Sequence, residues 1–122
     1  MTARLPGLRV YGDLTLAFVG GHTWKTLGQI VVWWRGGSLR VPQFVRTDLA
    51  SIPRLARPFA SVAGPWARAS VVHDWCYVAQ PDGWTRADAD ALFYWIMRHD
   101  GVTAWRAWAM WLGVRAGGWV LW

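Results

Sequence analysis

The sequence predicts an α+β fold, in which a small N-terminal antiparallel β-sheet is followed by a three-helix layer. The chain has 122 residues, the length of one domain, and 54% of them are hydrophobic, which is enough to form a core. Strand-like patterns are confined to the first third of the chain, and helical patterns follow them. We therefore expect a single domain over 1–122, with a β-rich part at 1–42 and a helical part at 43–122.

The N-terminal third contains three strand signals. Leucine and phenylalanine alternate with smaller side chains over 14–18, as in a half-buried strand, and Gly20–Gly21 then indicates a turn. The β-branched and aromatic residues of 29–35 are typical of a second strand. Gly36-Gly37-Ser38 indicates a tight hairpin turn, after which 39–41 returns as the partner strand.

Helical signals dominate after Pro42. Ile52-Pro53 predicts a short helical segment or turn that ends near Phe59. A helix with proline at its first position is expected over 65–79, followed by a turn at 80–83. The short turn makes the next helix an antiparallel neighbour of the first.

The second and third helices have their own start and stop signals. Thr85 and Asp88 form a capping box that opens a helix to about His99, and Asp100-Gly101 ends it. The last helix begins near Thr103.

Composition excludes several classes of protein. Cys76 is the only cysteine, which excludes a disulfide scaffold and a cysteine zinc site, and Cys76 itself is expected to be a small buried hydrophobic residue. The first nine residues have no apolar core and are not expected to be a signal peptide. The stretch 102–122 is long enough to span a bilayer, but Arg106 and Arg115 favour a buried terminal helix instead.

One cluster of residues is suited to chemistry. His73 and Asp74 are adjacent in the first predicted helix, and Tyr77 shares the face of His73 one turn later. Asp90 lies in the next helix, directly before an apolar run, at about the level of Tyr77. We therefore expect a hydrogen bond between His73 and Asp90, with Tyr77 bonded to the same carboxylate.

Two interpretations of this cluster stay open. A carboxylate that fixes the imidazole tautomer makes His73 a competent general base. The same side chains can instead form a buried structural brace, because a buried imidazole needs hydrogen-bond partners. Exposure separates the two, since a catalytic His73 must line a cleft and a brace need not.

Residues 73–77, His-Asp-Trp-Cys-Tyr, resemble the active-site helix motif of secreted phospholipase A2, which reads His-Asp-any-Cys-Tyr. The resemblance implies a hydrolase of lipid esters in which His73 is the general base and Asp74 binds calcium. It also implies that Asp90 orients the imidazole and that Tyr77 joins the network.

Asp48 has two interpretations as well. It can cap the local turn by accepting the amide of Ser51. Alternatively it is a second carboxylate facing Asp74, and two carboxylates with backbone carbonyls would suit calcium or magnesium. Such a pair would replace the glycine-rich calcium loop of the phospholipases, which this sequence lacks. Apart from this Ca²⁺ site we expect no cofactor.

A second resemblance covers 41–115. Three parts of the sequence resemble the domain of unknown function numbered 1353, which is found mostly in bacteriophage and prophage genomes. They are the stretch 41–54 (VPQFVRTDLASIPR), the 73–77 motif, and the later positions Ala89-Asp90, Phe93, Gly101-Val102, Trp105, Met110 and Gly113-Val114-Arg115. This resemblance implies a phage protein encoded among late, virion or lysis genes.

These observations lead to three functional hypotheses. The first is a bacteriophage or prophage protein of the virion or tail with a buried His-Asp-Tyr brace, located in the virion or the host cytoplasm. The second is a phospholipase A2-like metal-dependent esterase that uses His73 as general base. The third, based on the net charge of +6 and the aromatic content, is a basic protein that contacts nucleic acid, although its arginines are scattered along the sequence.

The last helix predicts a partner. Trp105, Trp108, Leu112 and Trp119 fall on one side, and a helix this apolar would leave a large exposed patch on a monomer. We expect another side to pack on the helix of Phe93 and Ile96. The exposed side would meet another phage structural protein or a membrane lipid surface, forming an oligomer or larger assembly. Arg106 and Arg115 would extend to water or to lipid phosphates.

Overall fold

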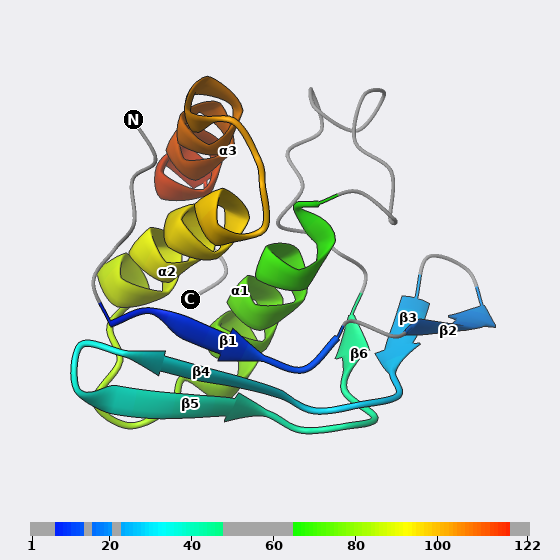
Figure 1. The fold of residues 1–122 in the computed structure, drawn as a ribbon. Coiled ribbons are helices and arrows are strands. Elements are labelled where there is room, and N and C mark those ends of the chain that lie inside the picture. The colour runs from blue at the N-terminus through cyan, green and yellow to red at the C-terminus, as the bar shows by residue number, and fades with distance from the viewer. Residues whose placement is uncertain (1–6, 14–15, 21–22, 48–64, 118–122) are drawn as a thin grey trace. The chain divides into compact units, whose positions relative to one another are not determined.

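The computed structural model describes residues 7–13, 16–20, 23–47 and 65–117. The chain forms two compact units, residues 1–48 and residues 49–122. The first unit contains antiparallel strands and the second contains three helices, which confirms the α+β class (Figure 1). The β-rich part continues past residue 42, because a short strand follows at 46–47.

One antiparallel sheet has the strand order β1-β4-β5, with β1 at Arg9–Tyr11, β4 at Ile30–Trp34 and β5 at Gly37–Val41. Its two longer strands bury alternate side chains, which are Ile30, Val32, Trp34, Leu39 and Val41. The side chains between them are exposed or half-buried, so the sheet has one apolar face and one solvated face.

The turn between β4 and β5 lies one residue earlier than the glycine pair suggested. Arg35 and Gly36 form it, with φ angles of 52° and 74°, while Gly37 pairs with Trp34 in the ladder. A two-residue turn with positive φ at both positions matches the twist of the flanking strands, so the hairpin prefers it. The Arg35 guanidinium carbon lies 4.0 Å from the ring centroid of Trp34.

The remaining strands form a second antiparallel sheet of order β2-β3-β6, with β2 at Leu16–Gly20, β3 at Thr23–Thr26 and β6 at Arg46–Thr47. The N-terminal strands thus divide between two sheets rather than forming one. Buried Thr26 connects this sheet to the loop between β5 and β6. Its hydroxyl donates to the carbonyl of Pro42 at 3.2 Å and accepts the amide of Val45 at 2.9 Å.

The second unit consists of α1 (Ala67–Ala79), α2 (Arg86–His99) and α3 (Ala104–Gly117), and α2 packs against both of the others (Figure 1). The capping box is confirmed, since Thr85 Oγ1 accepts the Asp88 amide at 3.1 Å and Asp88 Oδ2 accepts the Thr85 amide at 3.0 Å. The helix expected from Pro65 starts two residues later, after a turn at 65–66.

Polar contacts at the two ends of the pair show that α1 and α2 are antiparallel. At the start of α1, Arg68 Nε donates to Asp100 Oδ2 at 2.9 Å, and a second guanidinium nitrogen donates to Oδ1. Asp100 caps the end of α2. Near the other end of the pair, Tyr77 of α1 contacts Asp90 in the second turn of α2. The predicted helix hairpin is therefore confirmed.

The third helix has one buried side, made by Ala107, Met110 and Val114. Trp105, Trp108 and Leu112 are exposed. Trp119, Trp122 and the segment expected at 52–59 lie outside the described residues. Within the described ranges, no helix has both the length and the apolar character needed to cross a membrane.

Candidate functional site

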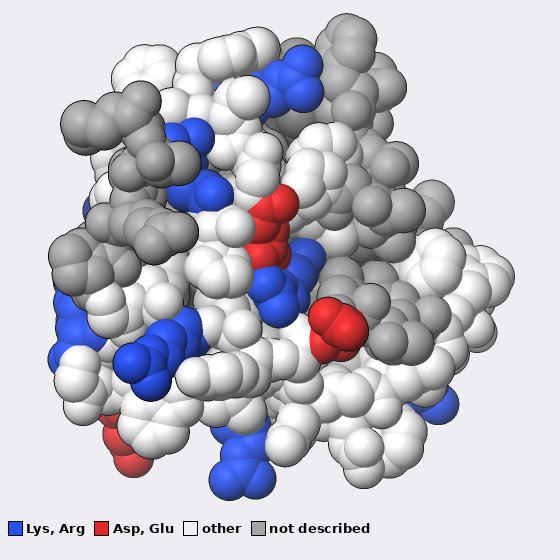
Figure 2. Space-filling view, in the orientation of Figure 1, with Lys and Arg blue, Asp and Glu red and all other residues white. Residues whose placement is uncertain are grey.

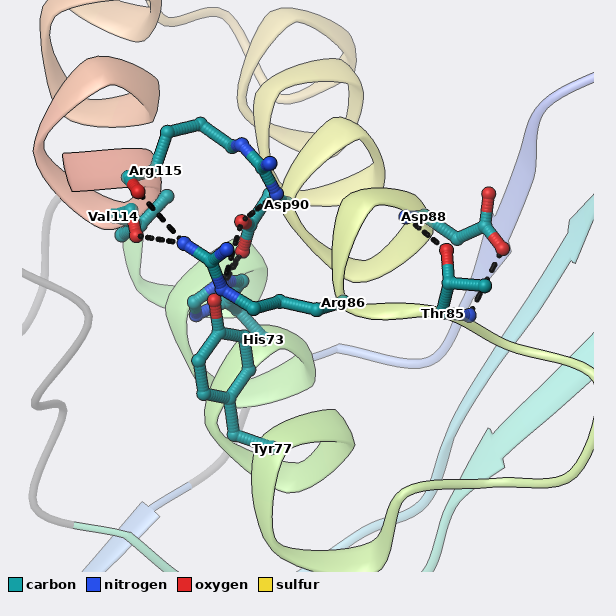
Figure 3. A network of polar contacts seen from close by, with 8 residues as sticks. All are labelled: His73, Tyr77, Thr85, Arg86, Asp88, Asp90, Val114 and Arg115. Atoms are coloured by element: carbon teal, nitrogen blue, oxygen red, sulfur yellow. Dashed lines mark hydrogen bonds and ion pairs between the residues drawn. The ribbon is translucent and has the colours of Figure 1, made fainter. Parts of the chain in front are cut away.

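A fully buried carboxylate, that of Asp90, lies where the three helices meet. The side chain is 0% exposed. Its Oδ1 lies 2.6 Å from His73 Nε2 and accepts the Tyr77 hydroxyl, also at 2.6 Å (Figure 3). His73 and Tyr77 are four residues apart on one face of α1, so both reach the same oxygen. The contact expected from helical phase is confirmed.

Two arginines complete the cluster, and neither was assigned to it from the sequence. Arg115, in the last turn of α3, donates through Nη1 to Asp90 Oδ2 at 2.8 Å. Arg86, one turn before Asp90 on α2, has its Nε 3.9 Å from the same oxygen. Arg115 was expected to extend to water or lipid phosphate; instead its Nη1 pairs with the buried carboxylate, while the side chain stays 34% exposed. Arg106 lies 5.3 Å from the Trp105 ring centroid.

Arg86 also holds the end of α3. Its Nη2 donates to the carbonyl of Arg115 at 2.7 Å and to that of Val114 at 3.4 Å (Figure 3). Carbonyls in the last turn of a helix have no partner within the helix, and a cation there also suits the helix dipole. The C-terminal turn of α3 is therefore held against α2 by two contacts, one from Arg86 to its carbonyls and one from Arg115 to Asp90.

The donors around Asp90 determine its charge. Burial alone would raise the pKa of Asp90 and is the largest influence. It is outweighed by hydrogen bonds from His73 and Tyr77, the attraction of His73 and the hydrogen bond from Arg115, so the pKa falls below its ordinary value of 3.8. The carboxylate is therefore ionised at neutral pH.

The same carboxylate suppresses ionisation of its neighbours on α1. Burial, the hydrogen bond to Asp90 and the charge of Asp90 all raise the pKa of Tyr77, although Arg86 opposes them. Burial and the charge of Asp90 raise the pKa of Cys76 to about 12. Cys76 is thus a buried neutral thiol, as expected, and Tyr77 acts as a hydrogen-bond donor.

His73 is enclosed by aromatic rings. Its ring centroid lies 4.3 Å from that of Tyr77 and 4.8 Å from that of Phe93 on α2. The side chain is only 3% exposed. Because an ionised carboxylate only accepts hydrogen bonds, Nε2 is the donor in the contact with Asp90 Oδ1.

The residues expected to hold a metal ion are Asp74 and Asp48. Asp74 is half-buried on α1, and Asp48, its expected partner, lies outside the described residues. Among the residues that the structure describes, no three or more His, Cys, Asp or Glu side chains gather in a way that could hold a metal ion.

The i,i+4 spacing of Arg86 and Asp90 is a signal that could have placed Arg86 at this site. Arg115 had no comparable local signal, because it lies 25 residues from Asp90 on another helix.

Comparisons with known proteins agree with the second resemblance found in the sequence. A family model described as "Protein of unknown function (DUF1353)" matches residues 31–114. The "Uncharacterized protein y4jT" of Sinorhizobium fredii (strain NBRC 101917 / NGR234) is 38% identical over 83 residues, which are 64% of this chain and 23% of that protein. The chain therefore corresponds to less than a quarter of that relative. No solved structure matches the chain significantly.

Proposed function

The chain belongs to the family described as "Protein of unknown function (DUF1353)", and we propose that it is a non-catalytic component of a bacteriophage or prophage particle, in the virion or tail. In this proposal Asp90 is a structural brace that holds three helices, and the exposed side of α3 binds another protein of the particle. The protein would then be found in the virion or in the host cytoplasm.

The burial of the Asp90 carboxylate and the hydrogen bonds that it accepts support this proposal. Its two oxygens accept three hydrogen bonds from His73, Tyr77 and Arg115, which belong to two different helices. A general base must meet a substrate water, whereas His73 is 3% exposed and enclosed by two rings. A brace needs no such access.

The exposed side of α3 supports a role in assembly. Trp105 is 67% exposed, and Trp108 and Leu112 follow on the same side at helical spacing. Large exposed aromatic side chains are typical of protein interfaces, where they supply much of the binding energy. We favour a protein partner, because virus particles are built by repeated contacts between chains.

Sedimentation of the full chain tests the assembly role. The wild type is expected to associate as its concentration rises, and Trp108→Glu should abolish the association by placing a charge in the contact. Val78→Glu is the matched control, since Val78 is 88% exposed on α1. A wild type that stays monomeric at every concentration and is missing from purified particles of its virus would overturn the proposal.

A second candidate function is a phospholipase A2-like esterase. The observation that favours it is the pairing of His73 Nε2 and Tyr77 with one carboxylate oxygen, which holds the imidazole in a single tautomer. In this candidate, His73 would take a proton from a water that attacks the ester carbonyl. Asp74 and Asp48 would hold a calcium ion, which would polarise that carbonyl.

Release of fatty acid from phospholipid vesicles tests this candidate. His73→Ala and Asp74→Asn should each abolish release, and circular dichroism should show that Asp74→Asn is folded. Full activity in excess chelator would exclude the cation. A folded wild type without activity on any ester, with and without calcium, would leave the brace as the function of the cluster.

A further inference from the structure

The solvated face of the β1-β4-β5 sheet combines aromatic and basic side chains. On β1 and β4, Tyr11 and Trp33 are 51% and 50% exposed. Arg9 and Arg40 are exposed on the two edge strands. These four side chains, named here the aromatic-basic face, alternate along their strands with residues that point to the apolar side.

The pairing register brings the four together. Trp33 lies directly opposite Arg9, while Tyr11 and Arg40 both lie opposite Val31, the residue two before Trp33. Trp33 therefore has Arg9 directly opposite, with β-carbons about 5 Å apart, and both Tyr11 and Arg40 as diagonal neighbours about 7–8 Å away. Residues that are scattered in the sequence thus form one compact group around an indole ring.

The charge of this part of the chain is one-sided. Between residues 7 and 47 the basic residues are Arg9, Lys25, Arg35, Arg40 and Arg46, and the only acidic residue is Asp13. Lys and Arg also cover more of the surface drawn in Figure 2 than Asp does. A surface with this charge attracts polyanions and repels cationic partners.

We propose that the aromatic-basic face binds single-stranded nucleic acid, with Tyr11 and Trp33 stacking on two bases and Arg9 and Arg40 contacting the phosphates. The spacing of the two aromatic residues, about 7–8 Å, is roughly twice the 3.4 Å rise of stacked bases, so it suits bases that have been separated from one another. Duplex bases are stacked and paired, and their faces are not accessible to these rings. Exposed aromatic residues on a sheet, flanked by arginine, are a known means of holding unpaired bases.

This inference is independent of the particle role and of the Asp90 cluster. It uses only residues of the first unit, whereas the brace and the assembly surface use residues of the second. An anionic membrane would also attract the arginines, but lipid headgroups offer no rings to stack. The dependence of binding on the aromatic character of residue 33 therefore separates the two ligands.

Fluorescence anisotropy with labelled oligonucleotides tests the proposal. The full chain should bind short oligo(dT) and oligo(rU) more tightly than a duplex of the same length, and comparing the two shows whether DNA or RNA is preferred. Trp33→Leu should weaken binding by between about fivefold and a hundredfold, whereas Trp33→Phe should retain most of it. The slope of log affinity against log salt is negative, and Arg9→Gln and Arg40→Gln should each make it less steep by about 0.7.

Phe44→Leu and Arg106→Gln are the matched controls, because Phe44 is 57% exposed in the loop before β6 and Arg106 is exposed on α3, both outside the aromatic-basic face. Neither should change oligonucleotide affinity. Equal affinity for duplex and single strands, or unchanged affinity in Trp33→Leu, would overturn the proposal in favour of simple charge attraction. Binding to phosphatidylserine vesicles but not to oligonucleotides would overturn it in favour of a membrane surface.

Discussion

Replacing Asp90 by asparagine is the sharpest test of the buried cluster, because it keeps the shape of the side chain and removes its charge. One oxygen becomes an NH₂ group that can only donate. Arg115 also only donates, so the remaining oxygen must face Arg115 and the NH₂ group must face His73 and Tyr77. His73 then has to accept through Nε2, which moves its proton to Nδ1, and the Tyr77 hydroxyl has to turn away.

The expected cost is about 2–4 kcal/mol of unfolding free energy. Removing one partner of a fully buried ion pair costs about 3–5 kcal/mol, and hydrogen bonds to charged groups contribute about 1.5–3 kcal/mol each. We expect the cost of Asp90→Asn to be less than the sum of these two contributions, because Arg115 is 34% exposed and its charge stays partly solvated. The remaining asparagine oxygen also retains one of the hydrogen bonds.

Urea unfolding followed by far-ultraviolet circular dichroism measures this cost. Asp82→Asn is the control, since Asp82 is exposed in the turn between α1 and α2 and should change the unfolding free energy by less than about 0.5 kcal/mol. An Asp90→Asn variant as stable as the wild type, or no less stable than Asp82→Asn, would refute the reasoning for both the brace and the oriented imidazole.

The other expectations concern the pH dependence of stability, the Cys76 thiol, the helix cap at Thr85 and the backbone at Gly12. Because the folded-state pKa of Asp90 is lowered, its contribution to stability is present above about pH 3.8 and is lost as the pH falls through the folded value, so acid titration should remove the difference between wild type and Asp90→Asn. Cys76, with its pKa raised to about 12, should not react with iodoacetamide at neutral pH until the protein is unfolded in urea. Thr85→Ala should cost about 1 kcal/mol in urea unfolding through loss of the capping box. Gly12→Ala should lower the melting temperature, because Gly12 has a φ of 100° and a β-carbon there would lie 2.3 Å from the carbonyl oxygen of Gln29; an unchanged melting temperature would contradict this.

Local signals in the sequence were enough to predict the helical part of the site. The capping box sets where α2 begins, and helical phase then places Asp90 toward the face of α1 that carries His73 and Tyr77. Each step depends on residues close together in the chain, where geometry is fixed by the 3.6-residue period.

Features that depend on distant residues could not be predicted in this way. The pairing of Arg115 with Asp90 depends on how α3 packs on α2, which no local pattern specifies. The aromatic-basic face depends on the register of β1 against β4, and no separate local pattern predicts β1. Two glycines in a row suggest a turn at Gly36-Gly37, but the register of β4 against β5 pairs Trp34 with Gly37 and so places the turn at Arg35-Gly36.

The polar character of the helix junction calls for a reason other than stability. Replacing a buried ion cluster by apolar side chains of similar volume is often neutral or stabilising, so the network is not explained by its contribution to the unfolding free energy. Apolar contacts tolerate small shifts of one helix along another, whereas Asp90 requires donors from α1 and α3 at fixed points. Arg86 adds a second fixed point at the last turn of α3. The cluster therefore fixes the position of α3 on α2, and with it the direction in which the exposed side chains of Trp105 and Trp108 point.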